Sequence, residues 1–211
     1  MSSFITASGI IELNEKTGER MKVLVVYSHP NPRSFCHAVL EAFTRGLEDG
    51  EHTFEVVDLY AIKFDPCIKL EDFVQFTGGQ MPQDVLSQQE KLSQADALAF
   101  IYPAYGWSRP AILEGWLQRV FSYGFAYKWG EKGYEGLLRP KKALLINTTA
   151  NSERDWKTSG VEDATKKVID TSLKMCGIQR AEHVFLYAVS SVDDETRKEY
   201  LQTAYRLGKE F

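Results

Sequence analysis

Five short runs of apolar, largely β-branched residues recur along the chain, at 21–28, 53–60, 96–102, 141–149 and 181–189. Runs without alternating polar residues are typical of strands buried on both faces, as in a parallel sheet. Parallel neighbours need crossovers, and segments with helical character follow the runs, at 35–47, 85–94, 111–121, 161–176 and 195–210. The pattern predicts an α/β fold, a doubly wound sheet of five parallel strands with helices on both faces.

Charge, the length of the apolar runs and the cysteine spacing exclude further classes of protein. The chain has 211 residues and a net charge of −4 without a long basic run, which argues against a nucleic-acid partner. Its apolar runs are too short for an integral membrane segment. Three widely spaced cysteines, at 36, 67 and 176, fit neither a metal site nor a disulfide framework and favour a reducing, cytoplasmic location. Residues 1–20 fall outside the alternating pattern, so we expect an N-terminal extension followed by one domain over 21–211.

Ligands of open parallel sheets bind beyond the carboxyl ends of the strands. The loop after the first strand, "SHPNPRS", holds His29, Arg33 and Ser34 just before a helix. Unpaired N–H groups and the helix dipole favour an anion there, typically a phosphate. The loop lacks the GxGxxG and Walker patterns, which excludes the usual dinucleotide and nucleoside triphosphate motifs. Ordinary N-capping by Ser34 is the alternative reading.

The loops after the third and fourth strands complete a possible site. "YPAYGWSR" places Tyr105 and Trp107 in a turn, where they could either cover a planar ring or join an oligomer interface. "NTTANSE" offers hydroxyl and amide groups, including Thr149 and Asn151, for a polar ring edge. A phosphate cradle, an aromatic wall and a polar rim at one sheet edge suit flavin mononucleotide better than a sugar or a peptide. A nucleophile elbow of the GxSxG kind is absent, which disfavours hydrolase chemistry.

Four stretches resemble the NAD(P)H quinone reductases of the flavodoxin-like superfamily: "DLYAIKFDP", "QQEKLSQADALAFIYP", "PAILEGWLQRVFSYGFAY" and "MCGIQRAEH". The resemblance extends from Lys22 to the last helix. It implies strand order 2-1-3-4-5, a tightly bound FMN or FAD, and NAD(P)H as electron donor. It also implies a homodimer with active sites at the interface. The chain ends before the extra C-terminal domain of the longer members, which favours FMN over FAD.

The resemblance also assigns roles to individual residues. The flavin phosphate falls at His29, Ser34, Phe35 and Cys36, beside the Arg33 of the same loop. The isoalloxazine ring falls at Pro103, Ala104, Tyr105, Gly106 and Trp107, and its pyrimidine edge at Thr148, Thr149, Ala150 and Asn151. Aromatic residues from the second subunit that close over the substrate correspond to Tyr127 and Trp129.

Some positions depart from the best-known members. Gly106 stands where they have a large aromatic residue, and Ala150-Asn151 where they have Gly-Gly. The Tyr and His that assist proton transfer in those members correspond to Trp156 and Glu162 here. These two residues are therefore the catalytic candidates, and the departure favours chemistry carried by the flavin itself.

We therefore expect hydride transfer from NAD(P)H through a bound flavin to a small acceptor (a quinone, azo dye, nitroaromatic or flavin) in a ping-pong cycle. A flavin-bound regulatory subunit of a potassium-efflux-type membrane system is the alternative. A one-electron flavodoxin-type carrier is a third possibility, which the mild charge and the aromatic segment near Trp129 disfavour.

Overall fold

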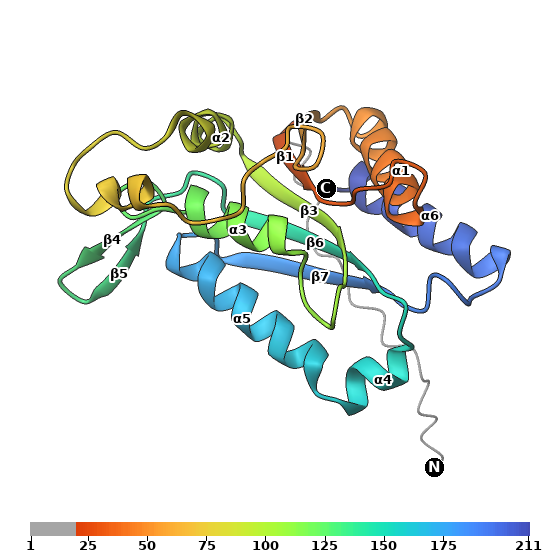
Figure 1. The fold of residues 1–211 in the computed structure, drawn as a ribbon. Coiled ribbons are helices and arrows are strands. Elements are labelled where there is room, and N and C mark those ends of the chain that lie inside the picture. Colours follow the sequence, from red (N-terminus) through yellow and green to blue (C-terminus); the bar gives the residue numbers. More distant parts are fainter. Residues whose placement is uncertain (1–19) are drawn as a thin grey trace, which may run out of the picture.

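The computed structural model describes residues 20–211 and contains the five-stranded parallel sheet expected from the sequence (Figure 1). The strand order is β2-β1-β3-β6-β7, with every neighbouring pair parallel. Because β6 and β7 are the fourth and fifth strands of this sheet, the predicted order 2-1-3-4-5 is confirmed. The strands are β1 (Lys22–Tyr27), β2 (Thr53–Asp58), β3 (Ala97–Pro103), β6 (Lys142–Thr148) and β7 (Arg180–Leu186). Apart from Arg20, the predicted N-terminal extension lies outside the described residues.

Helices cover both faces of the sheet (Figure 1). Alternate side chains of β3 divide between two apolar cores: Phe100 packs toward α2, α3 and α5, and Ile101 toward α1 and α6. All seven residues of β3 are buried, which explains why the sequence of this strand is continuously apolar. These helices are α1 (Phe35–Asp49), α2 (Gln83–Ser93), α3 (Ala111–Val120), α5 (Val161–Met175) and α6 (Asp194–Lys209).

Capping residues fix three of these helix ends, and Ser34 is the N-cap that the sequence offered as one reading. The Ser34 hydroxyl accepts a hydrogen bond from the His37 N–H at 3.1 Å and begins α1. The Asp193 carboxylate accepts from the Thr196 N–H at 2.9 Å and begins α6. Gly177, with φ of +97°, follows the end of α5, in the left-handed region that glycine enters without strain.

Three segments differ from the expected pattern. The polar stretch at 150–156, outside the predicted helices, holds the start of a short helix, α4 (Glu153–Thr158), which Ser152 caps. A 3-10 helix, η1 (Leu70–Phe76), lies within the long connection after β2. The fifth strand ends at Leu186, three residues before the predicted end, because Ala188 has φ of +50° and cannot continue it.

The segment between α3 and β6 forms a two-stranded antiparallel hairpin of β4 (Tyr127–Gly130) and β5 (Gly133–Gly136). It follows α3, which runs back along the sheet from the carboxyl ends of the strands. The hairpin and α4 therefore lie at opposite ends of the molecule (Figure 1). Within residues 20–211, no helix is both long enough and apolar enough to cross a bilayer.

Candidate functional site

The loops after β1, β3 and β6 meet at one edge of the sheet, because these three strands are direct neighbours. The His29 ring lies 6.4 Å from the Tyr105 ring, which joins the first loop to the aromatic turn. The Ala104 N–H donates to the Thr148 carbonyl at 2.8 Å, which joins the aromatic turn to the third of these loops. The structure thus brings together the three groups of residues that the sequence assigned to one site.

The first loop prepares the start of α1 for an anion. The Arg33 N–H donates to the Asn31 side chain at 2.9 Å, and the Ser34 N–H donates to the Asn31 carbonyl at 3.1 Å. The next two amides, of Phe35 and Cys36, point out of the first helical turn, where an α-helix offers them no acceptor. No acidic side chain stands in this turn, so nothing opposes an anion there.

His29 and Cys36, in this loop and at the start of α1, are both uncharged at neutral pH, and Arg33 carries the charge. Burial lowers the pKa of His29 below its usual value, so the ring is neutral at pH 7. Its Nδ1 accepts the Asn31 N–H at 3.0 Å, which leaves the proton on Nε2 as a donor. The exposed Arg33 supplies the positive charge. Burial raises the pKa of Cys36 to about 12, so its thiol stays protonated and cannot act as a nucleophile at neutral pH.

The aromatic turn is a two-residue reversal. The Tyr105 N–H donates to the Ser108 carbonyl at 2.9 Å, and the reverse bond is 3.0 Å. Gly106 and Trp107 between them have φ of +56° and +66°, as a type I′ turn requires. A tryptophan in the left-handed region is strained, and such strain gathers at functional sites. Trp107 remains 37% exposed and Tyr105 46%, so both rings offer surface to a ligand.

Hydrogen bonds within the loop after β6, and from this loop to β7, fix its conformation. The Thr149 hydroxyl oxygen accepts hydrogen bonds from the Trp156 indole N–H at 2.7 Å and from the Asn151 N–H at 3.1 Å. The Thr149 N–H donates to the Leu186 carbonyl at 2.9 Å. Thr148 and Thr149 are buried, whereas Ala150 and Asn151 are exposed. The predicted polar rim is therefore narrower than the sequence suggested, because the Asn151 N–H is used inside the loop and the Thr149 N–H is used by β7.

Sequence reasoning missed the contribution of the segment after β7. The Ala188 N–H donates to the Asn151 carbonyl at 2.9 Å, and the Val189 N–H donates to the Thr149 carbonyl at 3.0 Å. These bonds fix the loop after β6 from the side. This turn is hard to detect from the sequence, because "LYAV" continues the apolar run of the strand.

Several buried polar atoms near this edge have no hydrogen-bonding partner among the described residues. They are the Ser28 hydroxyl, directly after β1, and the Tyr102 hydroxyl and Asn147 amide oxygen, near the ends of β3 and β6. Nearly all buried polar atoms in proteins are paired, so such a cluster indicates a place where water or a polar ligand completes the structure. A flavin with its ring against the turn at Trp107 and its phosphate at α1 fits this edge.

The two catalytic candidates have different surroundings. Trp156 is fully buried, with its ring centre 5.2 Å from that of Trp107. Burial would raise the pKa of Glu162, but hydrogen bonds from Lys166 and Tyr187, at 2.5 and 2.6 Å, outweigh it and lower the pKa below its usual value. Glu162 is therefore ionised at neutral pH and has no proton to donate.

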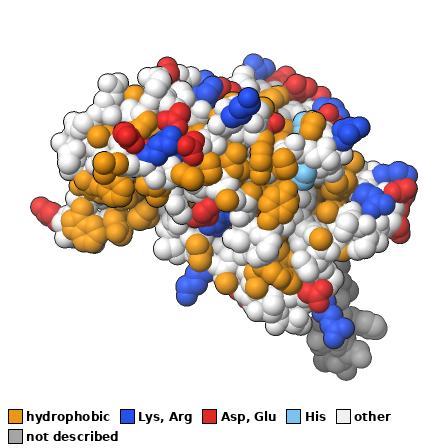
Figure 2. Space-filling model, in the orientation of Figure 1, with side chains coloured by type: hydrophobic (Ala, Val, Ile, Leu, Met, Phe, Trp, Pro, Cys, Tyr) orange, Lys and Arg blue, Asp and Glu red, His pale blue; other side chains and the backbone are white. Residues whose placement is uncertain are grey.

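Tyr127 and Trp129 do not join this edge. They lie on β4, in the hairpin at the other end of the sheet. Exposed apolar side chains of the hairpin and of η1 form what we call the hairpin patch: Leu70, Phe73, Phe76, Trp129 and Tyr134. Figure 2 shows hydrophobic side chains gathered over this part of the molecule. Within one chain, the two predicted substrate residues are thus separate from the predicted flavin residues.

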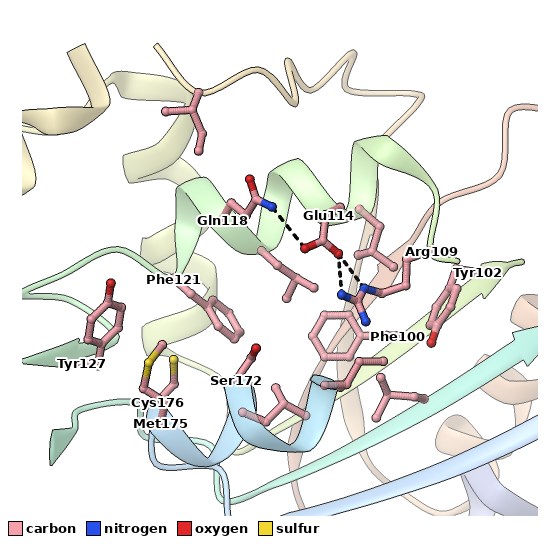
Figure 3. A pocket seen from close by; sticks show the side chains of 16 residues that line it. Phe100, Tyr102, Arg109, Glu114, Gln118, Phe121, Tyr127, Ser172, Met175 and Cys176 are labelled. Carbon is pink, nitrogen blue, oxygen red and sulfur yellow. Dashed lines mark hydrogen bonds and ion pairs between the residues drawn. The ribbon is translucent and has the colours of Figure 1, made fainter. Parts of the chain in front are cut away.

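A cavity of about 340 Å³ lies between α3 and α5 (Figure 3). Its walls are mostly apolar, and Arg109 and Glu114 form an ion pair at one side, with 2.8 Å between Nε and Oε2. Tyr127 is the one predicted site residue in its lining. The cavity therefore lies on a face of the sheet, and Tyr102 and Arg109 in its lining bring one side of it to the end of β3, beside the edge where the three loops meet.

Comparison with known proteins places the chain in a family. Residues 21–207 match the model of the flavodoxin-like fold family, and the chain belongs to that family. A solved structure of an NAD(P)H:quinone oxidoreductase from Methanothermobacter marburgensis is 33% identical. Its TM-score is 0.83, and the match covers 90% of this chain and 96% of that one.

Two curated relatives are similar at the same level. An uncharacterized NAD(P)H oxidoreductase of Haemophilus influenzae is 31% identical over 187 residues, which is 87% of this chain and 92% of that protein. A ribosyldihydronicotinamide dehydrogenase-like protein of Penicillium crustosum is 32% identical over 173 residues, which is 71% of this chain. The match spans 65% of the length of that relative. The predicted family is confirmed.

Proposed function

We propose that the protein is a flavin-dependent NAD(P)H:quinone oxidoreductase that carries FMN. The observation that carries the proposal is the convergence of three loops at one sheet edge, where the start of α1 lies beside an exposed aromatic turn and beside the exposed residues Ala150 and Asn151. The relationship to NAD(P)H oxidoreductases over most of the chain supports the same activity.

Each part of the edge has a defined task in this proposal. The Phe35 and Cys36 amides and Arg33 bind the phosphate, and Tyr105 and Trp107 cover the ring and exclude water. When bound, the flavin accepts hydride from NAD(P)H and passes it to the quinone. Because Glu162 is ionised and Trp156 does not titrate, neither side chain supplies the proton of the reaction.

The visible spectrum of the purified protein tests the cofactor. We expect flavin absorption, and release of FMN rather than FAD on denaturation. Protein that is colourless, and stays colourless after incubation with either flavin, would contradict the proposal.

Steady-state kinetics test the activity. With 2-methyl-1,4-naphthoquinone as acceptor, we expect NAD(P)H oxidation with parallel double-reciprocal lines, because the nicotinamide leaves before the quinone enters the same site. Bound flavin without turnover would favour the regulatory-subunit alternative.

The hairpin patch supports a homodimer in which each chain completes the site of the other. Trp129 is 64% exposed and Leu70 84% exposed, in a patch of a kind that usually marks a protein interface. Tyr127 and Trp129 lie far from the flavin edge of their own chain, so they can cover the substrate only in a second copy.

Light scattering and substitution of Trp129 test this arrangement, and we expect a dimer by light scattering. Trp129→Ala should raise KM for the quinone with unchanged FMN content, and Trp129→Phe should not. A monomer with full activity would contradict this arrangement.

The cysteines support a reducing location. Cys36, Cys67 and Cys176 are unpaired, and two of them are buried. We place the protein in the cytoplasm, where NAD(P)H is supplied and thiols stay reduced.

A further inference from the structure

We propose that Trp156 is a positioning residue that aims the Ala150 N–H at the pyrimidine edge of the flavin. This inference rests on the proposed function, because it assumes that a flavin binds at this edge. Trp156 stands where the best-known relatives have a tyrosine that assists proton transfer. The inference instead gives Trp156 a part in flavin binding and in setting the redox potential of the flavin.

The argument starts from the amides of the loop after β6. The Thr149 N–H donates to the Leu186 carbonyl, and the Asn151 N–H donates to the Thr149 hydroxyl oxygen. The Ala150 N–H between them donates to no group in the described part of the chain. Ala150 is exposed, so its N–H is the backbone donor of this stretch that remains for a ligand.

The direction of that donor depends on the Thr149 hydroxyl. Its oxygen accepts two hydrogen bonds, from the Asn151 N–H at 3.1 Å and from the Trp156 indole at 2.7 Å. Both lone pairs are then occupied, which fixes the rotamer of Thr149 and the peptide planes on either side of Ala150. Without the indole N–H, the hydroxyl can rotate and release the Asn151 amide.

Trp156 is itself held rigidly. It is fully buried, and its ring packs between Trp107, at 5.2 Å, and Phe185, at 5.3 Å between ring centres. The same side chain therefore links the aromatic turn to the donor loop. A fixed amide at the pyrimidine edge stabilises the negative charge of the reduced ring more than the neutral oxidised ring.

Hydrogen exchange of the flavin-free protein tests the local part of this inference. In Trp156→Phe, which keeps an aromatic ring and removes the N–H, we expect faster exchange at the Asn151 amide. Trp116→Phe is the matched control, because Trp116 is also fully buried and donates one hydrogen bond from its indole, to Gln88 at 3.3 Å. The control should lose stability without changing exchange at Asn151. Unchanged exchange in Trp156→Phe would overturn the inference.

Flavin titration tests the cofactor part. We expect Trp156→Phe to raise the Kd for FMN about fivefold to tenfold, the effect of one hydrogen bond, with a larger rise for reduced FMN. Each tenfold difference between the two forms lowers the two-electron midpoint potential by about 30 mV. Thr149→Val should reproduce the change and Thr149→Ser should not. The double variant Trp156→Phe, Thr149→Val should show no additional loss.

The outcomes separate the two proposals. Tight FMN binding by the wild type, with the same Kd and potential in Trp156→Phe, would overturn the positioning role and leave the proposed function intact. A wild type that binds no flavin would overturn the proposed function together with the cofactor part of this inference.

Discussion

The two ends of α3 hold polar groups in opposite ways. At its C-terminal end, Arg119 is fully buried and uses all its N–H groups, on the Asp72 carboxylate, the Asp84 carboxylate and the Asp65 carbonyl, at 2.6–3.3 Å. Just before its N-terminal end, the strand ends hold buried polar atoms without partners, and Trp107 is strained.

This difference shows which end of α3 stabilises the fold and which end is available to a ligand. Arg119 ties η1 and the start of α2 to α3, and so orders a connection that has few other regular elements. Its network is complete, so nothing is left over for a ligand. The opposite end keeps unpaired groups and surface aromatics at a cost in stability, which is expected where a ligand completes the structure.

Removal of the Arg119 charge should have the largest effect. Arg119→Met leaves the Asp72 carboxylate buried without its partner, and we expect a loss of about 3–5 kcal/mol in the free energy of unfolding. Urea denaturation measures it. Arg139→Met is the control, because its ion pair with Asp96 is exposed and should contribute less than about 1 kcal/mol. Equal losses in the two variants would show that the buried network stabilises the fold no more than an exposed ion pair does.

The same network should make stability depend on pH. Burial would raise the pKa of Asp72, but hydrogen bonds from Arg119 and from the Lys69 N–H lower it below the usual value. The unfolded chain therefore binds this proton first as pH falls. The stabilisation is complete above about pH 4, the usual aspartate pKa, and is lost as pH falls through the folded pKa.

Comparison with Asp72→Asn isolates this group. We expect the wild type to be the more stable at pH 7, and the gap in urea midpoint to narrow as the pH is lowered below about 4. A gap that stays constant down to pH 3 would contradict the lowered pKa.

The sequence predicts the fold and the strand-end loops, but it does not predict the side-chain contacts at either end of α3. The fold followed from runs such as residues 96–102, because a continuously apolar strand has few alternatives to a buried parallel sheet. The strand-end loops were located for the same reason. The Arg119 network was missed, because its partner Asp72 lies 47 residues away in a stretch without periodicity. The indole bond of Trp156 was missed as well, since sequence spacing does not reveal which buried group a side chain contacts.

At the N-terminal end of α3, Trp107→Ala tests the proposed aromatic wall of the flavin site. We expect the Kd for FMN to rise about twofold to tenfold, the effect of losing one aromatic contact of about 0.5–1.5 kcal/mol. Flavin fluorescence titration measures it. Tyr134→Ala, which removes an exposed aromatic side chain of the hairpin patch, should leave this Kd unchanged. Wild-type affinity in Trp107→Ala would remove Trp107 from the site.

The smallest expected effect concerns the strain at Trp107. Its φ of +66° costs about 1–2 kcal/mol for any residue with a Cβ, including alanine, and glycine escapes that cost. Glycine also adds about 0.5–1 kcal/mol of unfolded-chain entropy relative to alanine. The relief exceeds the entropy, so Trp107→Gly should be more stable than Trp107→Ala by about 0.5 kcal/mol, while both bind FMN equally weakly. If the alanine variant is the more stable by urea denaturation, the strain at this position is smaller than the entropy cost of glycine, and the contrast between the two ends of α3 then rests mainly on the unpaired polar atoms.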